Sequence, residues 1–211
     1  MKGPLPPYGQ MQSFLAPQEL RLILEWALAS RAQFRPAKVI GGIVDPAKRV
    51  AMTLRELGPM DAVLRRALRA ALPWVFANTG TQPFEPKSIE LEVAAHGHGA
   101  HFSAHRDIPV GSGRLTLGGE GSGTQDRVLS SVLYFYKEPK GFSGGELRLH
   151  RFGSDGLPDD YVDLQPLQNS LVVFPSWATH EVRPITSSGS FDDSRFAVNC
   201  WFCREWPRSV T

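Results

Sequence analysis

The pattern of hydrophobic and polar positions divides this chain into a helical first part and a strand-rich second part. Between residues 17 and 72, apolar residues recur three or four positions apart, which predicts amphipathic helices. From residue 88 onward they alternate with polar residues, or form short runs bounded by glycine, proline and aspartate, which indicates β-strands. The pattern therefore places the main boundary at about residue 87.

Two helices are expected in the first part. The first begins at Pro17, a residue type favoured at the first helical position, and has Glu19 in its first turn, where a negative charge suits the helix dipole. Its apolar stripe comprises Leu20, Ile23, Leu24, Ala27 and Leu28. The second is expected from about Pro59 to Leu72, with Pro73 stopping or kinking it. Its inward positions are Met60, Val63, Leu64, Ala67, Leu68 and Ala71. A short strand over residues 38–44, weakened by two glycines, is expected between the helices.

The second part reads as a succession of short strands. Ile89, Leu91 and Val93 alternate with polar residues, and further strands are expected over residues 101–107, 127–137, 145–152, 160–164, 170–174, 180–185 and 195–203. Because no helical pattern separates them, an antiparallel sandwich or barrel is favoured. The expected fold is mainly β (α+β), a jelly-roll barrel with N-terminal helices packed on it. We expect a single domain over 1–211, with 1–86 as helical support and 87–204 as the jelly roll.

Composition and charge narrow the function classes. The chain is 42% hydrophobic and 21% charged with a net charge of +2, so nothing in its charge favours nucleic acid or a membrane surface as partner. Arg65, Arg66 and Arg69 lie on the outer face of the second expected helix, where a solvated face explains them better than a nucleic-acid site. The opening residues lack the apolar core of a signal peptide, and no run approaches the ~20 apolar residues of a membrane span. A cytoplasmic protein is therefore expected, and the sequence favours no particular oligomeric state.

The cysteine pair and a glycine-rich segment are two further features that could carry chemistry. Cys200 and Cys203 form a C-x-x-C spacing without a second cysteine pair, and three residues along a strand places their thiols on opposite faces, so two apolar strand residues are expected. The segment Val110–Asp126 contains six glycines and no phosphate-binding motif. It is either a lid that closes over a substrate or an unconstrained linker of two strands.

The residues His105-Arg106-Asp107 carry the clearest chemical signal. In a strand, side chains two apart share a face, so His105 and Asp107 form a pair of metal ligands. His180, which follows an apolar strand and a turn, supplies a third ligand. Two histidines and one carboxylate are the facial triad of non-haem iron oxygenases, whereas zinc hydrolases more usually use three histidines or two histidines and a glutamate. A cupin site built on His96 and His98 lacks the glutamate that should follow them a few residues later.

The order of several motifs resembles one family. His105-x-Asp107, Gly144-Gly145-Glu146-Leu147, the run from Asn169 to Phe174, His180-Glu181-Val182 and Arg195-Phe196-Ala197-Val198 are similar to the Fe(II)/2-oxoglutarate-dependent dioxygenases, in particular the prolyl 4-hydroxylase-like branch. The resemblance covers about residues 89–202. It implies a double-stranded β-helix, which agrees with the barrel expected from the strand pattern.

The resemblance also implies roles for individual residues. Arg195 would bind the distal carboxylate of 2-oxoglutarate, with Asn199 on the same strand face as a helper and Tyr134 as a further contact. Arg183 is a rival for the anchoring role, but its spacing from His180 turns it to the opposite face. His96 stands where relatives frequently have a tyrosine, and either bonds to 2-oxoglutarate or merely fills the site.

The implied activity is hydroxylation. Fe(II) is the metal, 2-oxoglutarate and O₂ are co-substrates, and ascorbate is a candidate reductant by family analogy. Asp107 favours hydroxylation, because related halogenases replace this carboxylate with Ala or Gly. The expected substrate is a prolyl or other side chain in a protein or peptide. The alternatives are a small-molecule hydroxylase acting on a free amino acid or biosynthetic intermediate, a non-catalytic metal-binding or sensing barrel, and a zinc-dependent or cupin-type isomerase.

Overall fold

The computed structural model describes residues 3–39, 42–108, 125–151 and 160–205. In chain order its elements are β1 (Gly9–Met11), α1 (Pro17–Ala29), the 3-10 helix η1 (Arg31–Gln33), β2 (Arg35–Pro36), β3 (Arg49–Val50), β4 (Met52–Leu54), α2 (Met60–Thr79), β5 (Ser88–His96), β6 (His101–His105), β7 (Gln125–Phe135), β8 (Phe142–Gly144), β9 (Leu147–His150), β10 (Tyr161–Leu164), β11 (Ser170–Pro175), β12 (His180–Val182), β13 (Ile185–Ser187), the 3-10 helix η2 (Phe191–Asp193) and β14 (Arg195–Glu205). All but the last two residues of the glycine-rich segment 110–126 lie outside the described residues, and so does the choice between a lid and a linker.

Two antiparallel sheets form the body of the fold. The larger has the strand order β1-β11-β7-β14-β5-β4-β2 and the smaller β10-β9-β12-β6-β3, while β13 and β8 form a separate pair. The two large sheets face each other, because Tyr134, Val172 and Ala197 of the first pack in one cluster with Leu147 and Leu149 of the second. The jelly-roll fold expected from the sequence is confirmed.

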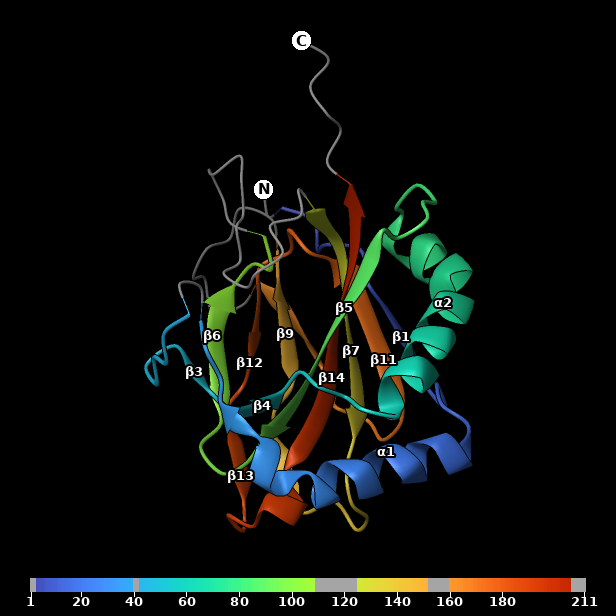
Figure 1. The fold of residues 1–211 in the computed structure, drawn as a ribbon. Helices are drawn as coiled ribbons and strands as arrows, with labels where there is room; N and C mark the ends of the chain where they lie inside the picture. Colours follow the sequence, from blue (N-terminus) through green and yellow to red (C-terminus); the bar gives the residue numbers. More distant parts are fainter. Residues whose placement is uncertain (1–2, 40–41, 109–124, 152–159, 206–211) are drawn as a thin grey trace.

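The helices cover the other face of the seven-stranded sheet (Figure 1). Apolar residues of α1 and α2 pack with Ile89, Leu91 and Val93 of β5 and with Phe196 and Val198 of β14 in the largest core cluster. Because this sheet is covered on both faces, Glu92 and Ala197, which lie between these residues on β5 and β14, are buried as well. They face the five-stranded sheet, and it is there that the candidate site lies.

Helix α2 differs from its prediction in one respect. It does not stop at Pro73 but continues to Thr79 and ends where Gly80 adopts a left-handed conformation with φ 63°. A proline inside a helix costs about 3 kcal/mol. Pro73 lies on the exposed side, and the turns beyond it bury Val75 and Thr79, which extends the apolar stripe and offsets that cost.

Two strand predictions were also wrong in part. Among the described residues of 38–44 there is no strand; Val39 donates to the Ile43 carbonyl in a turn, and Ile43 is 59% exposed with no sheet to pack on. The expected strand 180–185 is divided into β12 and β13, since Pro184 lacks the N–H that a continuous ladder needs. The remaining strands begin and end within about three residues of their expected bounds.

The first 86 residues contribute strands as well as helices. β1 pairs with β11, and β4 with β5, both in the larger sheet, while β3 pairs with β6 in the smaller one. On α2, Arg65, Arg66 and Arg69 form ion pairs with Asp61, Glu19 and Glu85 respectively. None of the described helices combines the length and apolar character needed to cross a membrane.

Candidate metal centre and its cavity

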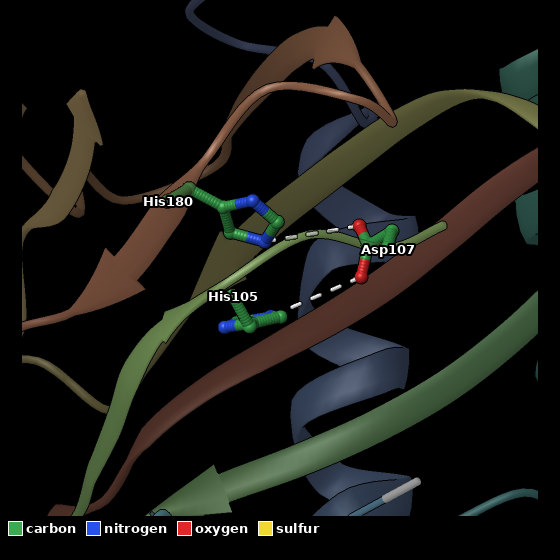
Figure 2. A group of neighbouring side chains, drawn as sticks. All are labelled: His105, Asp107 and His180. Carbon is green, nitrogen blue, oxygen red and sulfur yellow. Dashed lines mark ion pairs between the residues drawn. The ribbon is translucent and has the colours of Figure 1, made fainter. Parts of the chain in front are cut away.

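Three predicted ligands converge between the ends of two neighbouring strands. His105 ends β6 and His180 begins β12, and the two residues lie opposite each other in the antiparallel ladder. Their rings are 4.2 Å apart between centroids, and the carboxylate of Asp107 points toward both (Figure 2). The pairing of β6 with β12 therefore brings together ligands 75 residues apart in sequence.

The spacing of the ligand atoms suits a single ion. His105 Nε2 is 3.9 Å from Asp107 Oδ1, and His180 Nε2 is 3.7 Å from Asp107 Oδ2. One potential ligand atom from each residue lies within 4.8 Å of the other two. Two donors that each lie about 2.1 Å from an ion are at most about 4.2 Å apart, so only a small adjustment would place all three on one metal.

Asp107 reaches the site by a different route from the one expected. β6 ends at His105, so strand alternation does not orient Asp107. Its backbone N–H instead donates to the Ser176 carbonyl at 3.1 Å, which ties the residue to the segment before His180. Arg106 does not line the site and donates from Nε to the Thr179 hydroxyl at 2.9 Å.

Both histidines are held in the tautomer that a metal requires. His105 Nδ1 lies 2.9 Å from the Ser103 carbonyl, and His180 Nδ1 lies 2.9 Å from the Ala178 carbonyl. Because a carbonyl can only accept, each Nδ1 carries the proton and each Nε2 presents its lone pair to the site. Burial, with the neighbouring His180, lowers the pKa of His105 to about 3, so its imidazole is neutral at physiological pH.

Two serines orient the carboxylate. The Ser130 hydroxyl donates to Asp107 Oδ2 at 2.5 Å and lies 2.9 Å from the Ser176 hydroxyl. Burial raises the pKa of Asp107, but His180, His105 and the Ser130 hydrogen bond together lower it by more, so the pKa lies below its ordinary value. Asp107 is thus an ionised ligand, and its Oδ2 already accepts a hydrogen bond from Ser130.

A cavity of about 50 Å³ extends from these ligands between the two sheets. A single water needs about 10–15 Å³ by the same measure, so there is room for a small ligand. The seven residues singled out from the sequence all line it: His96, His105, Asp107, Tyr134, His180, Arg195 and Asn199.

Arg195 places an unpaired positive charge inside this cavity. The side chain is 1% exposed, and among the described residues its Nε and Nη1 have no hydrogen-bond partner. Its guanidinium lies 5.0 Å from the centre of the Tyr134 ring, whose buried hydroxyl also has no partner in the described part of the chain. Burial raises the pKa of Tyr134 to about 12, so it stays protonated as a donor. A buried unpaired cation is costly, so this end of the cavity suits an anion.

The two remaining predicted contacts lie on the same sheet face. His96 is opposite Arg195 in the β5–β14 ladder, and burial, with the charges of Arg195 and Arg49, holds its pKa well below the ordinary 6.5. Asn199 lies next to Glu92 on β5. The rival anchor Arg183 does not line the cavity and bonds to Glu181 at 3.1 Å.

The histidine pair of the cupin alternative is separated. His96 is buried beside Arg195, whereas His98 is exposed and accepts a hydrogen bond from the Ser187 N–H at 3.3 Å. Among the described residues, His105, Asp107 and His180 are the group of histidine, cysteine and acidic side chains that could hold a metal.

The chemistry of the donor set fits both implied groups. His105, Asp107 and His180 would hold a divalent iron and leave the other half of its coordination sphere open. Arg195 would meet the free carboxylate of a dicarboxylate such as 2-oxoglutarate, because a guanidinium binds carboxylates in a bidentate manner. A cavity lined by both Arg195 and the three ligands thus provides one charge partner for each end of that molecule.

Sequence reasoning missed the residues that support this site. Ser130 was detectable, since two serines interrupt the otherwise apolar run 128–136 in a strand with both faces covered. Arg49, which also lines the cavity, comes from the two-residue strand β3, where no periodic signal exists. Gly145 belongs to the motif Gly144-Gly145-Glu146-Leu147, but the motif alone does not reveal that this glycine lies against Arg195 and Ile185 of β13.

Comparison with known proteins agrees with this geometry. A sequence model of the 2OG-Fe(II) oxygenase superfamily matches residues 91–203, more than half of the chain. A protein of Synechocystis sp. named an uncharacterized PKHD-type hydroxylase is 29% identical over 199 residues. That alignment covers 92% of this chain and 62% of the relative, so the chain spans about three fifths of the relative's length.

Solved structures share the fold. A prolyl-4-hydroxylase of Pseudomonas putida superposes with a TM-score of 0.66 at 21% identity, covering 94% of this chain and 93% of that one. A prolyl hydroxylase of Trichoplax adhaerens, solved with a peptide fragment of the oxygen degradation domain of hypoxia inducible factor, gives 0.67 at 16% identity, covering 93% and 83%. The site and the match over 91–203 lead to one conclusion: the chain belongs to the 2OG-Fe(II) oxygenase superfamily.

Proposed function

We propose that this protein is an Fe(II)- and 2-oxoglutarate-dependent dioxygenase that hydroxylates an unactivated C–H bond of a prolyl or other side chain in a protein or peptide. The observation that carries the proposal is the buried guanidinium of Arg195, which lies in the same cavity as His105, Asp107 and His180 and has two nitrogens without a partner among the described residues. A barrel that only held a metal would have no need of that charge. The likeness to two prolyl hydroxylases, one of them solved with a peptide, supports a peptide substrate.

Each group in the cavity has a part in this reaction. Bound iron and 2-oxoglutarate would supply O₂ activation, with 2-oxoglutarate converted to succinate and CO₂ and one oxygen atom transferred to the substrate. Arg195 and Tyr134 bind and orient the distal carboxylate. His96 lies opposite Arg195 and Asn199 opposite Glu92; both line the cavity and help to exclude water. Ser130 holds the ligand carboxylate in one orientation.

Ligand binding and uncoupled turnover test this proposal. The wild-type chain should bind Mn(II) and then 2-oxoglutarate without O₂, and the Fe(II) form should release succinate slowly in the presence of ascorbate. Asp107→Ala should lose metal binding, and Arg195→Gln should weaken 2-oxoglutarate binding by about tenfold or more while metal binding remains. Arg183→Gln is the matched control, because this arginine pairs with Glu181 outside the cavity. If the wild type binds neither metal nor 2-oxoglutarate, the proposal is wrong.

Substrate screening separates the two kinds of hydroxylase. Proline-containing peptides and free amino acids would each be tested for stimulated succinate release and for products heavier by one oxygen atom. Stimulation by peptides alone supports the proposal, whereas stimulation by free amino acids alone assigns the protein to the small-molecule hydroxylases.

A further inference from the structure

A second arginine lines the cavity near the metal ligands. Arg49 of β3 lies opposite Phe102 of β6, and its guanidinium carbon is 4.9 Å from the centre of the Phe102 ring. That ring in turn stacks on the imidazole of His105, with centroids 3.5 Å apart. Only one aromatic side chain therefore links Arg49 to a metal ligand. Arg49 also precedes residues 91–203, so the family match does not account for it.

Arg49 and Arg55 share one carboxylate, that of Glu92. Arg49 Nη2 donates to Glu92 Oε1 at 2.7 Å, and Arg55 Nε donates to Oε2 of the same carboxylate at 3.1 Å. Burial raises the pKa of Glu92 and the two guanidiniums lower it by more, so the carboxyl is ionised. Arg55 is 74% exposed, so water solvates its charge, and Arg49 is the buried partner of Glu92.

One donor of Arg49 also lacks a partner. Nη1 bonds to the Lys38 carbonyl at 3.2 Å, whereas the buried Nε has no partner among the described residues. The side chain is 9% exposed and lines the cavity, so a ligand bound there could supply the missing acceptor. 2-Oxoglutarate has two carboxylates, and on the proposed function one meets the metal and the other Arg195. Arg49 is then left for a different anion.

We propose that Arg49 binds a carboxylate of the primary substrate and thereby selects carboxylate-bearing substrates. The inference rests on the proposed function and deepens it by naming the substrate class. Arg49 contacts the same Phe102 ring that stacks on a metal ligand, so the bound carboxylate would lie near the carbon that is oxidised. An acidic residue of a peptide and a free amino acid both supply this group, and the test has one arm for each.

Matched acid–amide pairs provide the test. The full chain is loaded with Mn(II) and saturating 2-oxoglutarate, which occupy the metal ligands and Arg195. Calorimetry then gives dissociation constants for short proline peptides with Asp or Asn beside the proline, and for free amino acids against their amides. We expect the acid to bind about tenfold or more tightly than the amide in one arm, the difference that a charge-assisted hydrogen bond provides. The arm with the preference identifies the source of the carboxylate.

Three variants make the outcome specific to Arg49. Arg49→Gln should bring the acid-to-amide ratio close to one. Arg49→Lys keeps the positive charge but loses the paired N–H donors of the guanidinium, so it should give an intermediate acid-to-amide ratio. This variant provides the test if Arg49→Gln does not fold. Arg55→Gln is the matched control, since Arg55 binds the same Glu92 but is 74% exposed and does not line the cavity; its ratio should stay near that of the wild type.

The contrary results are distinct from a failure of the proposed function. If Mn(II) and 2-oxoglutarate bind but no pair shows an acid preference in the wild type, the carboxylate proposal alone is wrong. It is equally wrong if the preference exists and folded Arg49 variants retain it in full. If the metal and 2-oxoglutarate do not bind at all, both proposals are wrong.

Discussion

Gly145 lies directly against the side chain of Arg195. A Cβ built at residue 145 would be 2.9 Å from Arg195 Nε and 3.0 Å from its Cδ, and 2.8 Å from Ile185 Cγ1. The backbone at Gly145 also has φ +74°, a conformation that other residues rarely adopt. The glycine therefore leaves the space in which the guanidinium lies.

Gly145→Ala should displace Arg195 and weaken 2-oxoglutarate binding by about tenfold or more, because charge-assisted hydrogen bonds to the carboxylate depend on their geometry. Calorimetry on the Mn(II)-loaded protein measures the change. Gly99→Ala is the control, since Gly99 has the same φ of +74° but nothing within 4 Å of the added Cβ. Equal losses in the two variants would mean that backbone strain, not contact with Arg195, is responsible.

Ser130→Ala should weaken metal binding by about tenfold, because the Asp107 carboxylate loses the donor that fixes its orientation. Competition with a metal indicator gives the dissociation constant for Mn(II). Ser131→Ala provides the comparison, since this neighbour is equally buried but does not hydrogen-bond to Asp107. Unchanged metal affinity in Ser130→Ala would show that the backbone hydrogen bond from Asp107 to Ser176 is enough to position the carboxylate.

His96 should make the metal-free protein less stable as the pH falls below 6.5. Burial and two arginines hold its folded-state pKa well below that value, so the unfolded chain takes up a proton that the folded chain does not. The free energy of unfolding then rises with pH in this range, by up to about 1.4 kcal/mol per pH unit for one proton. Urea unfolding from pH 7.5 to 5 should give a shallower pH dependence for His96→Gln. Identical slopes would mean that His96 is protonated in the folded state.

The two cysteines should be inert in the folded protein. Both are buried and free, and burial raises the pKa of each thiol to about 12. Since the thiolate is the reactive form, a thiol reagent at pH 8 should modify them only at the rate of unfolding. Full reaction in urea is the positive control. Rapid labelling of the native protein would contradict the placement of Cys200 and Cys203.

Much of this fold follows from local patterns that the tertiary structure reinforces. The helical spacing from Leu20 to Leu28 correctly predicts α1, and the alternation from Ile89 to Val93 correctly predicts β5. In both elements the predicted apolar face is the one that packs in the core. The failure at Pro73 has a tertiary cause, since the burial of Val75 and Thr79 outweighs a local preference to stop. The strand expected over 38–44 is absent from the described residues of that range for the opposite reason, because an apolar run without a sheet to join does not form a strand.

The candidate site likewise contains residues that local patterns reveal and residues that only the tertiary structure brings together. His105, Asp107, His180 and Arg195 could be found from spacing and order along the chain, since each lies at a strand end or at a fixed distance from one. Arg49 could not, because only the pairing of β3 with β6 brings it to the cavity. The glutamates of β5 look like solvent-facing residues in sequence, yet Glu92 is 3% exposed and paired inside the fold.

The positions of β14 and β3 within their sheets have a consequence for altering this protein. Arg195 is on a strand with hydrogen-bonded neighbours on both sides, whereas Arg49 is on the outermost strand of the five-stranded sheet, with a neighbour on one side only. A border strand can be exchanged or lengthened without breaking a ladder beyond it. Replacing residues 42–50, which end with β3, should therefore change the choice of substrate while Arg195 continues to bind 2-oxoglutarate. Substrate selection and co-substrate binding can then be engineered separately.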